Sequence, residues 1–258
     1  MTTGIEEPAA PDAFDRPDTP DGRDALHGPI RWQQATVVDI VDETPTAKTF
    51  RLALARQTPH LAGQHFVVRL TAPDGYQASR SYSVASAPGD PGVIELTVER
   101  LEDGEISSFL HDVVVPGDAL EVRGPIGRWF VWEGETRALL LGGGSGIVPL
   151  MAMLRLARAR GTSDQVRLVQ SVRLPGDLYY RDELAGPETT VVYTRVAPPG
   201  STRPAGHLAA ADLRPAILPD ATAYVCGSAA FCDAATGLLT DLDFPVDRIR
   251  VERFGATG

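Results

Sequence analysis

Apolar and polar residues follow two different patterns in the two halves of this 258-residue chain. From Arg31 to about Glu133, short alternating runs are separated by turns such as Pro73–Gly75. Alternation with a period of two indicates strands with one buried face, and six such runs favour a small antiparallel barrel. The strands are expected at Gln34–Val41, Thr49–Leu54, His65–Leu70, Ser81–Ala85, Val93–Glu99 and Ala119–Val122, with one helical turn near Ile106–Asp112.

After Trp132–Thr136 the pattern changes to apolar runs that alternate with helical stretches. This alternation predicts a parallel sheet of five strands with helices on both faces. We therefore expect two domains, at residues 30–133 and 134–258. The strands are expected at Ala138–Leu141, Val166–Val172, Thr190–Arg195, Ala223–Cys226 and Arg248–Phe254, and the helical stretches at Pro149–Arg160, Arg181–Leu184, His207–Asp212 and Ala229–Leu242.

Residues 1–29 differ from both halves, because they hold five prolines, seven acidic residues and two arginines. This composition predicts a disordered acidic tail, and it lacks the basic and apolar regions of a signal peptide. No apolar run approaches the ~18–20 residues that span a bilayer, so we expect no membrane insertion. The formal net charge of −10 argues against a nucleic acid partner.

Cysteine and histidine do not form a metal-binding pattern in this sequence. The two cysteines, Cys226 and Cys232, cannot supply the four ligands of an iron–sulfur cluster. The five histidines show no ligand spacing, so we expect no metal site. Two cysteines also do not make a disulfide framework, which favours a cytoplasmic location.

A glycine loop joins a strand to a helix at Leu139–Pro149. Glycines let the backbone approach a pyrophosphate, and the helix that follows turns its positive end toward the anion. Ile147 stands where the Gly-x-Gly-x-x-Gly fingerprint needs its third glycine, so the usual Rossmann spacing fails. A structural turn is the alternative, but the position after the first strand of an α/β domain favours phosphate binding.

The first half carries a cation, an aromatic ring and two hydroxyls in the run Arg80-Ser81-Tyr82-Ser83. Alone, this run is weak evidence for a binding site, because Arg80 could be a surface charge, Tyr82 a barrel residue and Ser83 a solvated hydroxyl. Gly104–Ser108 downstream repeats the anion-binding pattern, since a glycine precedes hydroxyls at the start of a helical turn. Together with the glycine loop, these runs suggest one site for a flavin and one for a nicotinamide dinucleotide.

Five motifs occur in the order seen in the ferredoxin–NADP reductase family, which the chain resembles from residue 31 onward. The resemblance is greatest to the two-domain flavin reductases that serve bacterial oxygenases. It implies an FAD-binding antiparallel barrel, an NAD(P)-binding α/β domain and hydride transfer from NADPH or NADH to FAD. The motifs are Arg80–Ser83, Gly104–Ser107, Gly142–Pro149, Tyr224–Gly227 and Val251–Gly255.

The resemblance also implies roles for individual residues toward FAD. Arg80 would pair with the flavin phosphate, Tyr82 would stack on the isoalloxazine, and Ser83 would lie beside flavin N5. Phe254 would cover the second face of the ring, unless it is only a core residue. The FAD contacts expected from the resemblance are Arg80, Ser81, Tyr82, Ser83, Thr97, Val98, Glu99, Gly104, Ile106, Ser107 and Phe254.

The expected nicotinamide nucleotide contacts are Gly143, Gly144, Ser145, Gly146, Arg173, Thr194, Arg195, Cys226 and Gly227. Thr194-Arg195 is similar to the Ser-Arg pair of NADPH-using relatives, and Arg203 is a further candidate cation. NADPH is favoured, with NADH left open. Ser83, Cys226 and Glu252 are the expected catalytic residues. Cys226 would orient the nicotinamide and Glu252 would relay a proton, although a core thiol and a surface charge are the simpler alternatives.

The resemblance implies a separate electron acceptor, such as a ferredoxin, a flavodoxin, a haem protein or an oxygenase component, and we expect a monomer. The alternatives are a reductase of free flavin and an electron-transfer subunit of a larger redox complex. The stretch from Met151 to Arg173 contains five arginines and only one acidic residue, Asp164. We interpret them as a solvated helix face, with docking of an acidic acceptor as the alternative.

Overall fold

The computed structural model describes residues 30–254, of which residues 31–254 lie in one compact unit. The expectation of a disordered acidic tail at residues 1–29 falls outside the described range. Within residues 30–254, no helix combines the length and the apolar character that a bilayer crossing demands.

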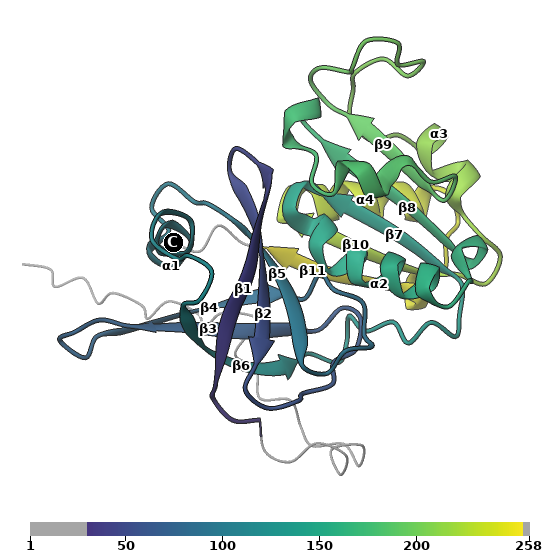
Figure 1. The fold of residues 1–258 in the computed structure, drawn as a ribbon. Coiled ribbons are helices and arrows are strands. Elements are labelled where there is room, and N and C mark those ends of the chain that lie inside the picture. Colours follow the sequence, from purple (N-terminus) through teal and green to yellow (C-terminus); the bar gives the residue numbers. More distant parts are fainter. Residues whose placement is uncertain (1–29, 255–258) are drawn as a thin grey trace, which may run out of the picture. The chain divides into compact units, whose positions relative to one another are not determined.

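Six antiparallel strands form the first sheet (Figure 1), in the order β4-β3-β6-β1-β2-β5. A bridge between Val84 and Leu96 links the two ends of this order, so the sheet curls into a barrel. Helix α1 contacts both edge strands. The elements are β1 (Gln33–Thr44), β2 (Ala47–Leu54), β3 (His65–Thr71), β4 (Gln77–Ser83), β5 (Val93–Glu99), α1 (Glu105–Asp112) and β6 (Ala119–Ile126).

Alternation of inward and outward side chains builds most of the barrel core. In β1, Ala35 and Val37 are buried while Thr36 and Val38 face outward. The inward side chains of all the strands meet in one cluster, because closing the sheet brings every alternate residue to the inside. The largest members of this cluster are Phe50, Leu52, Phe66, Ile94 and Leu96.

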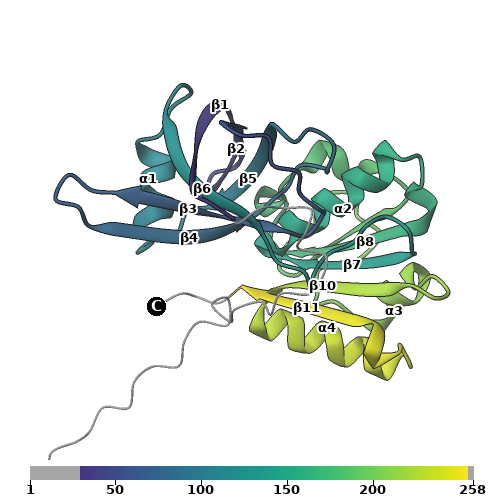
Figure 2. The same ribbon diagram turned by 90° about the horizontal axis from the view of Figure 1, so that it is seen from below.

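Five parallel strands form the second sheet, in the order β11-β10-β7-β8-β9. Helices α2 and α4 cover its opposite faces (Figure 2). Leu140 of the central strand packs on the α2 side, and Leu139 and Leu141 pack on the α4 side. The elements are β7 (Ala138–Gly143), α2 (Ile147–Ala159), β8 (Val166–Val172), β9 (Thr189–Tyr193), α3 (Ala210–Leu213), β10 (Thr222–Ser228), α4 (Ala229–Asp241) and β11 (Ile249–Phe254).

The fold class expected from the sequence is confirmed, with local shifts. Strand β4 begins at Gln77 and ends at Ser83, whereas the sequence suggested Ser81–Ala85. Its outer residues are exposed on both faces, which removes the alternation that marks a strand. The helical stretch expected at Arg181–Leu184 is a 3-10 turn at Arg181–Ala185. The stretch expected at His207–Asp212 is the shorter helix α3, which begins at Ala210. The domain boundary between residues 133 and 134 stays a prediction.

Replacing Leu140 should destabilise the fold most directly, since its side chain is fully buried in the central strand of the parallel sheet. We expect Leu140→Ala to lower the free energy of unfolding by about 2–5 kcal/mol in denaturant titrations. Val246→Ala is the control, because Val246 is 67% exposed. Equal losses in both variants would contradict this packing.

Candidate active site

The outer edge of β4 is open along the predicted flavin-binding run. Strand β4 pairs with β3 on one side and ends the sheet order on the other. Arg80 and Ser81 are exposed there, and Arg80 Nη1 donates to the Ser79 carbonyl at 2.9 Å. No ion pair joins Arg80 to another residue in the described part of the chain. An exposed cation beside unpaired backbone fits a phosphate group.

Tyr82 lies on the same strand with its ring half-buried against the barrel core. Burial raises the pKa of Tyr82 well above its ordinary value, and the charge of Arg80 opposes this only in part. The phenol therefore stays neutral, and the exposed part of the ring can serve as a stacking surface.

The end of β5 offers backbone rather than side chains. Val98 is buried in the barrel core, and the Thr97 hydroxyl is shared with Thr49 at 2.7 Å and with Tyr180. Glu99 is exposed at the end of the strand. The resemblance placed all three at the flavin, and the structure leaves the side chains of Thr97 and Val98 turned into the protein.

The start of α1 is shaped by its own short contacts. The Ser107 hydroxyl accepts from the Leu101 N–H at 3.1 Å and donates to the Gly104 carbonyl at 3.1 Å. A Cβ on Gly104 would overlap Ser107 Oγ, which explains the glycine. Ile106 is buried. The first backbone N–H groups of the helix are therefore what this turn can offer to an anion.

The glycine loop is a tight 3-10 turn at Gly144–Gly146 that leads directly into α2. Gly144 has a φ of +56° and open space around its Cα, whereas a Cβ on Gly146 would overlap the carbonyl of Cys226. The first turn of α2 carries no acidic residue, and Pro149 lies within it as expected. This loop brings a helix N-terminus and bare backbone to one surface, the arrangement that suits a pyrophosphate.

Sequence reasoning missed Gln170, a buried residue that holds the glycine loop from the protein interior. Its side chain is buried in β8 opposite Gly142, and Nε2 donates to the Gly144 carbonyl at 2.9 Å. Because a peptide's C=O and N–H point in opposite directions, this bond turns the next N–H away from Gln170. A glutamine inside the apolar run Leu168–Val172 was the available signal.

Phe231, near the start of α4, lies beside the same loop. Its ring lies directly against the backbone of Gly143 and Gly227, where a Cβ on either glycine would meet it. It therefore forms an apolar wall beside the loop.

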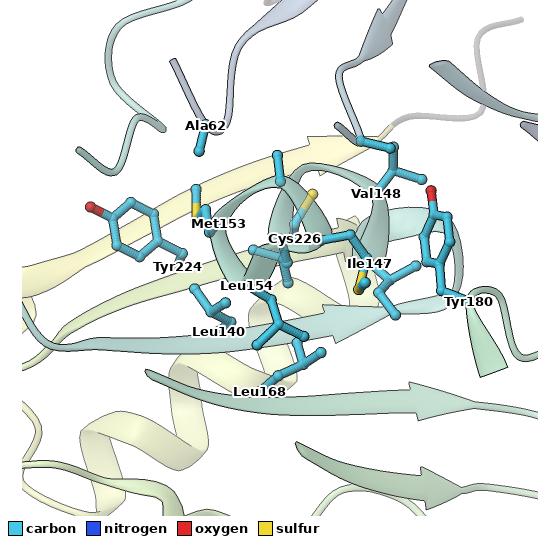
Figure 3. Packing of buried hydrophobic residues seen from close by; sticks show 14 of the residues in the cluster. Ala62, Leu140, Ile147, Val148, Met153, Leu154, Leu168, Tyr180, Tyr224 and Cys226 are labelled. Atoms are coloured by element: carbon cyan, nitrogen blue, oxygen red, sulfur yellow. The ribbon is translucent and has the colours of Figure 1, made fainter. Parts of the chain in front are cut away.

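The three expected catalytic residues lie together, and they come from three strands. The parallel register of β10 and β11 sets Cys226 opposite Glu252. Ser83, at the end of β4, lies close enough to the Glu252 carboxylate to influence its pKa. Ser83 is 7% exposed and Cys226 is fully buried. Figure 3 shows Cys226 among side chains of α2, including Ile147 and Leu154.

Burial changes the protonation of this group. It raises the pKa of Glu252 to about 7, and the nearby Ser83 hydroxyl opposes the shift. Burial also raises the pKa of the Cys226 thiol, with a further contribution from Glu252. Cys226 therefore stays a neutral thiol, which fits an orienting contact and not a nucleophile. Glu252 can exchange a proton near neutral pH.

Phe254 ends the described chain at the edge of the parallel sheet. It pairs in register with Ser228 and packs, half-buried, against the cluster that also contains Ala85.

Two of the three arginines expected at the far end of the coenzyme lie side by side. The Arg195 N–H donates to the Arg173 carbonyl at 3.1 Å, and both residues are exposed next to Thr194. Arg203 differs, because its guanidinium pairs with Asp212 at 2.6 Å and donates to carbonyls of its own loop. It is not available as a third cation.

The arginine-rich stretch also differs from the expected solvated face. Arg155 pairs with Glu95 at 2.9 Å, and Arg158 pairs with Glu188 at 2.5 Å. Both guanidinium groups are largely covered, so neither belongs to a solvated face or to a docking surface. Local charge in the sequence did not reveal partners that are distant along the chain.

Comparisons with known families agree with the two successive sheets of the fold. An oxidoreductase FAD-binding domain matches residues 34–131, and an oxidoreductase NAD-binding domain matches residues 140–236. The fold is similar to the FAD/NAD-binding domain of a nitric oxide dioxygenase from Vibrio cholerae, with a TM-score of 0.76, 24% identity and coverage of 86% of this chain and 98% of that one. The fold is also similar to that of an Amycolatopsis cytochrome P450 reductase, with a TM-score of 0.73 and 28% identity. The match covers 88% of this chain and 70% of that one.

Curated relatives include the phenol hydroxylase P5 protein of Acinetobacter pittii, which is 29% identical over 92% of this chain and 69% of its own length. The flavohemoprotein of Bordetella pertussis is 32% identical over 88% of this chain and 61% of its own. This chain thus spans about two thirds of these relatives. Fold and matched domains define a class, the oxidoreductases that bind FAD and NAD in successive domains. The chain belongs to the ferredoxin reductase-like family of this class.

The raised pKa of Glu252 makes stability depend on pH. The folded carboxyl holds its proton up to about pH 7, whereas its ordinary pKa is 4.5. The folded state binds more protons between these values, so stability falls as pH rises through this window. We expect Glu252→Gln to match the parent near pH 4.5 and to be more stable by about 1–3 kcal/mol at pH 8 in denaturant titrations. A pH-independent difference would contradict the raised pKa.

Proposed function

We propose that this protein is an NAD(P)H-dependent FAD oxidoreductase that passes electrons to a separate acceptor. The observation that carries the proposal is the convergence of two ligand-binding edges on one group of side chains. The open edge of β4 ends at Ser83, the glycine loop packs against Cys226, and Glu252 lies between them.

The barrel residues fit a flavin nucleotide. Arg80 offers an exposed charge for the phosphate, and unpaired backbone along β4 offers hydrogen bonds beside it. Tyr82 offers the face of its ring, and the start of α1 offers backbone N–H groups for a pyrophosphate. Two phosphate-binding elements on one barrel favour FAD over FMN.

The α/β residues fit a nicotinamide dinucleotide. Gly144–Gly146 would hold the pyrophosphate, with Gln170 fixing the loop from the buried side. Arg173 and Arg195 would meet the 2′-phosphate of NADPH, so we propose NADPH as the preferred coenzyme. Phe231 would limit the width of the same surface.

FAD, when bound, accepts a hydride from the reduced nicotinamide and releases the electrons singly. The chain contributes position and proton control. Ser83, beside Glu252, would offer its hydroxyl to the flavin edge, and the neutral thiol of Cys226 would orient the nicotinamide. Glu252, with a pKa of about 7, holds or releases a proton at its carboxylate.

The proposed acceptor is a separate protein of the ferredoxin, flavodoxin, haem or oxygenase-component class, and the proposed state is a monomer. Residues 1–258 contain two cysteines, fewer than an iron–sulfur cluster requires. Several relatives are named as reductase components of monooxygenases, including that of propane 2-monooxygenase from Rhodococcus jostii. This supports an acceptor of the oxygenase type.

An anaerobic titration tests the proposal. The purified protein should be yellow, and NADPH should bleach its flavin absorbance at one equivalent, with NADH less effective. A protein that takes up neither FAD nor FMN would contradict the proposal at its first step. Bleaching with loss of the reduced flavin on gel filtration would point instead to a free-flavin reductase.

Replacing Arg80 should weaken flavin binding, because it removes the charge assigned to the phosphate. We expect Arg80→Ala to raise the dissociation constant for FAD by about 10-fold or more. Arg51→Ala is the matched control, since Arg51 is also an exposed barrel arginine. Flavin fluorescence during reconstitution measures both, and equal affinities would remove Arg80 from the site.

Arg195 should separate the two coenzymes. We expect Arg195→Ala to raise KM for NADPH by about 10-fold and to leave KM for NADH within about 2-fold, because only NADPH carries the 2′-phosphate. Steady-state kinetics with an artificial acceptor measure the ratio. A parallel rise for both coenzymes would show that Arg195 does not read the phosphate.

A further inference from the structure

Tyr180 occupies an unusual position between the barrel and the parallel sheet. It has left-handed backbone angles, φ 53° and ψ 34°, which are uncommon for a residue other than glycine. Its side chain is buried, and Figure 3 shows it beside Val148 near the start of α2. Contacts must hold a residue in this conformation, since the backbone does not favour it.

Those contacts form a closed circuit of hydrogen bonds with three barrel strands. The backbone N–H of Tyr180 donates to Glu43 Oε2 at 2.9 Å. Glu43 Oε1 accepts from the Thr49 hydroxyl at 2.7 Å, and Thr49 shares a bond with Thr97 at 2.7 Å. Thr97 in turn bonds to the Tyr180 hydroxyl.

The direction of every proton in this circuit follows from one bond. Thr49 donates its hydroxyl proton to Glu43, so it must accept from Thr97. Thr97 then accepts from Tyr180, whose phenol is neutral because burial raises its pKa. All four side chains are thus satisfied together, and removal of one hydroxyl leaves a buried neighbour without its partner.

Arg155 adds a second connection at the same place. From α2, its guanidinium reaches Glu95 of β5 and the Ala85 carbonyl, each at 2.9 Å. It also pairs with Glu183 through bonds of 2.9 and 2.5 Å, and it lies 5.0 Å from the centre of the Tyr180 ring. One side chain therefore ties α2, β5 and the Arg181–Ala185 turn together.

We propose that Arg155 and Tyr180 form a clamp that fixes the glycine-loop helix against the flavin-binding strand β5. The clamp is a positioning device, and this inference rests on the proposed function. Helix α2 begins at the glycine loop, and β5 belongs to the barrel whose open edge at β4 would hold the flavin. Hydride transfer needs donor and acceptor within ~3–3.5 Å, so the angle between these two elements must be held closely.

Arg158 provides a matched control on the same helix. Its guanidinium is similarly covered and bonds to Glu188 and to the Glu183 carbonyl, all within the α/β half. Arg158→Met thus removes a comparable ion pair without touching a barrel residue. Any effect that depends on the clamp should distinguish Arg155 from Arg158.

The first test measures the placement of the two halves, with no turnover needed. Spin labels are attached to Val38→Cys in β1 and Val246→Cys, both exposed, in the full-length protein. Cys226 and Cys232 are fully buried and should not react. We expect one narrow distance population in electron double resonance, unchanged by Arg158→Met and broadened about twofold or more by Arg155→Met. An equally narrow population in Arg155→Met would overturn the proposal.

The second test measures single-turnover flavin reduction by NADPH. We expect Arg155→Met to slow flavin reduction by about 10- to 100-fold at saturating coenzyme. The NADPH concentration that gives half of the limiting rate should change less than about 3-fold, and the FAD content should not change. Arg155→Lys should recover part of the rate, because lysine keeps the positive charge but lacks the planar guanidinium that donates to several acceptors at once. Arg158→Met should lower thermal stability and leave the rate within about 2-fold.

Tyr180→Phe keeps the proposal testable if Arg155 variants do not fold. It removes one hydroxyl and preserves packing, and we expect both a broader distance population and a slower reduction. An unchanged distance distribution and rate in Tyr180→Phe would overturn the clamp. If the parent protein is not reduced by either coenzyme, the proposed function fails, while the distance measurement still decides on the clamp.

Discussion

The close approach of Ser83 to Glu252 brings the last residue of a barrel strand to the last strand of the parallel sheet, and the candidate site depends on this junction. Glu252 reaches this position because β11 pairs with β10 in parallel register, opposite Cys226. Ligands of open α/β sheets bind at the carboxyl ends of the strands, and this edge is where the barrel meets the sheet. Burial at the junction also sets the protonation of Glu252 and Cys226.

Much of this fold could be predicted from the sequence, because periodicity reports burial directly. The run Val93–Glu99 alternates as a barrel strand must, and Val166–Val172 is buried at every position except Arg167, as a strand covered on both faces must be. Strand β4 was displaced by several residues because its exposed outer half carries no hydrophobic signal. Turns and strand ends depend on pairing partners, which a single sequence does not display.

The candidate site was predictable where a motif is local and not where it depends on distant partners. Arg80, Ser83 and the glycine loop lie in short runs with their own chemistry, and the structure brings them to connected edges. The roles of Arg155, Arg203 and Gln170 depend on partners 9 to 70 residues away. Their charge or polarity was visible in the sequence, but what each one contacts is set by the three-dimensional pairing of the strands.

The rate of flavin reduction in a single turnover of Ser83→Ala shows whether the flavin and nicotinamide sites meet at Ser83. Ser79→Ala is the control, since Ser79 is an exposed serine on the same strand. If the two ligand-binding edges converge on Ser83, Ser83→Ala should slow reduction by saturating NADPH by about 10- to 100-fold, and Ser79→Ala should not. Equal rates in both variants, with FAD bound normally, would contradict the convergence on which the account is built.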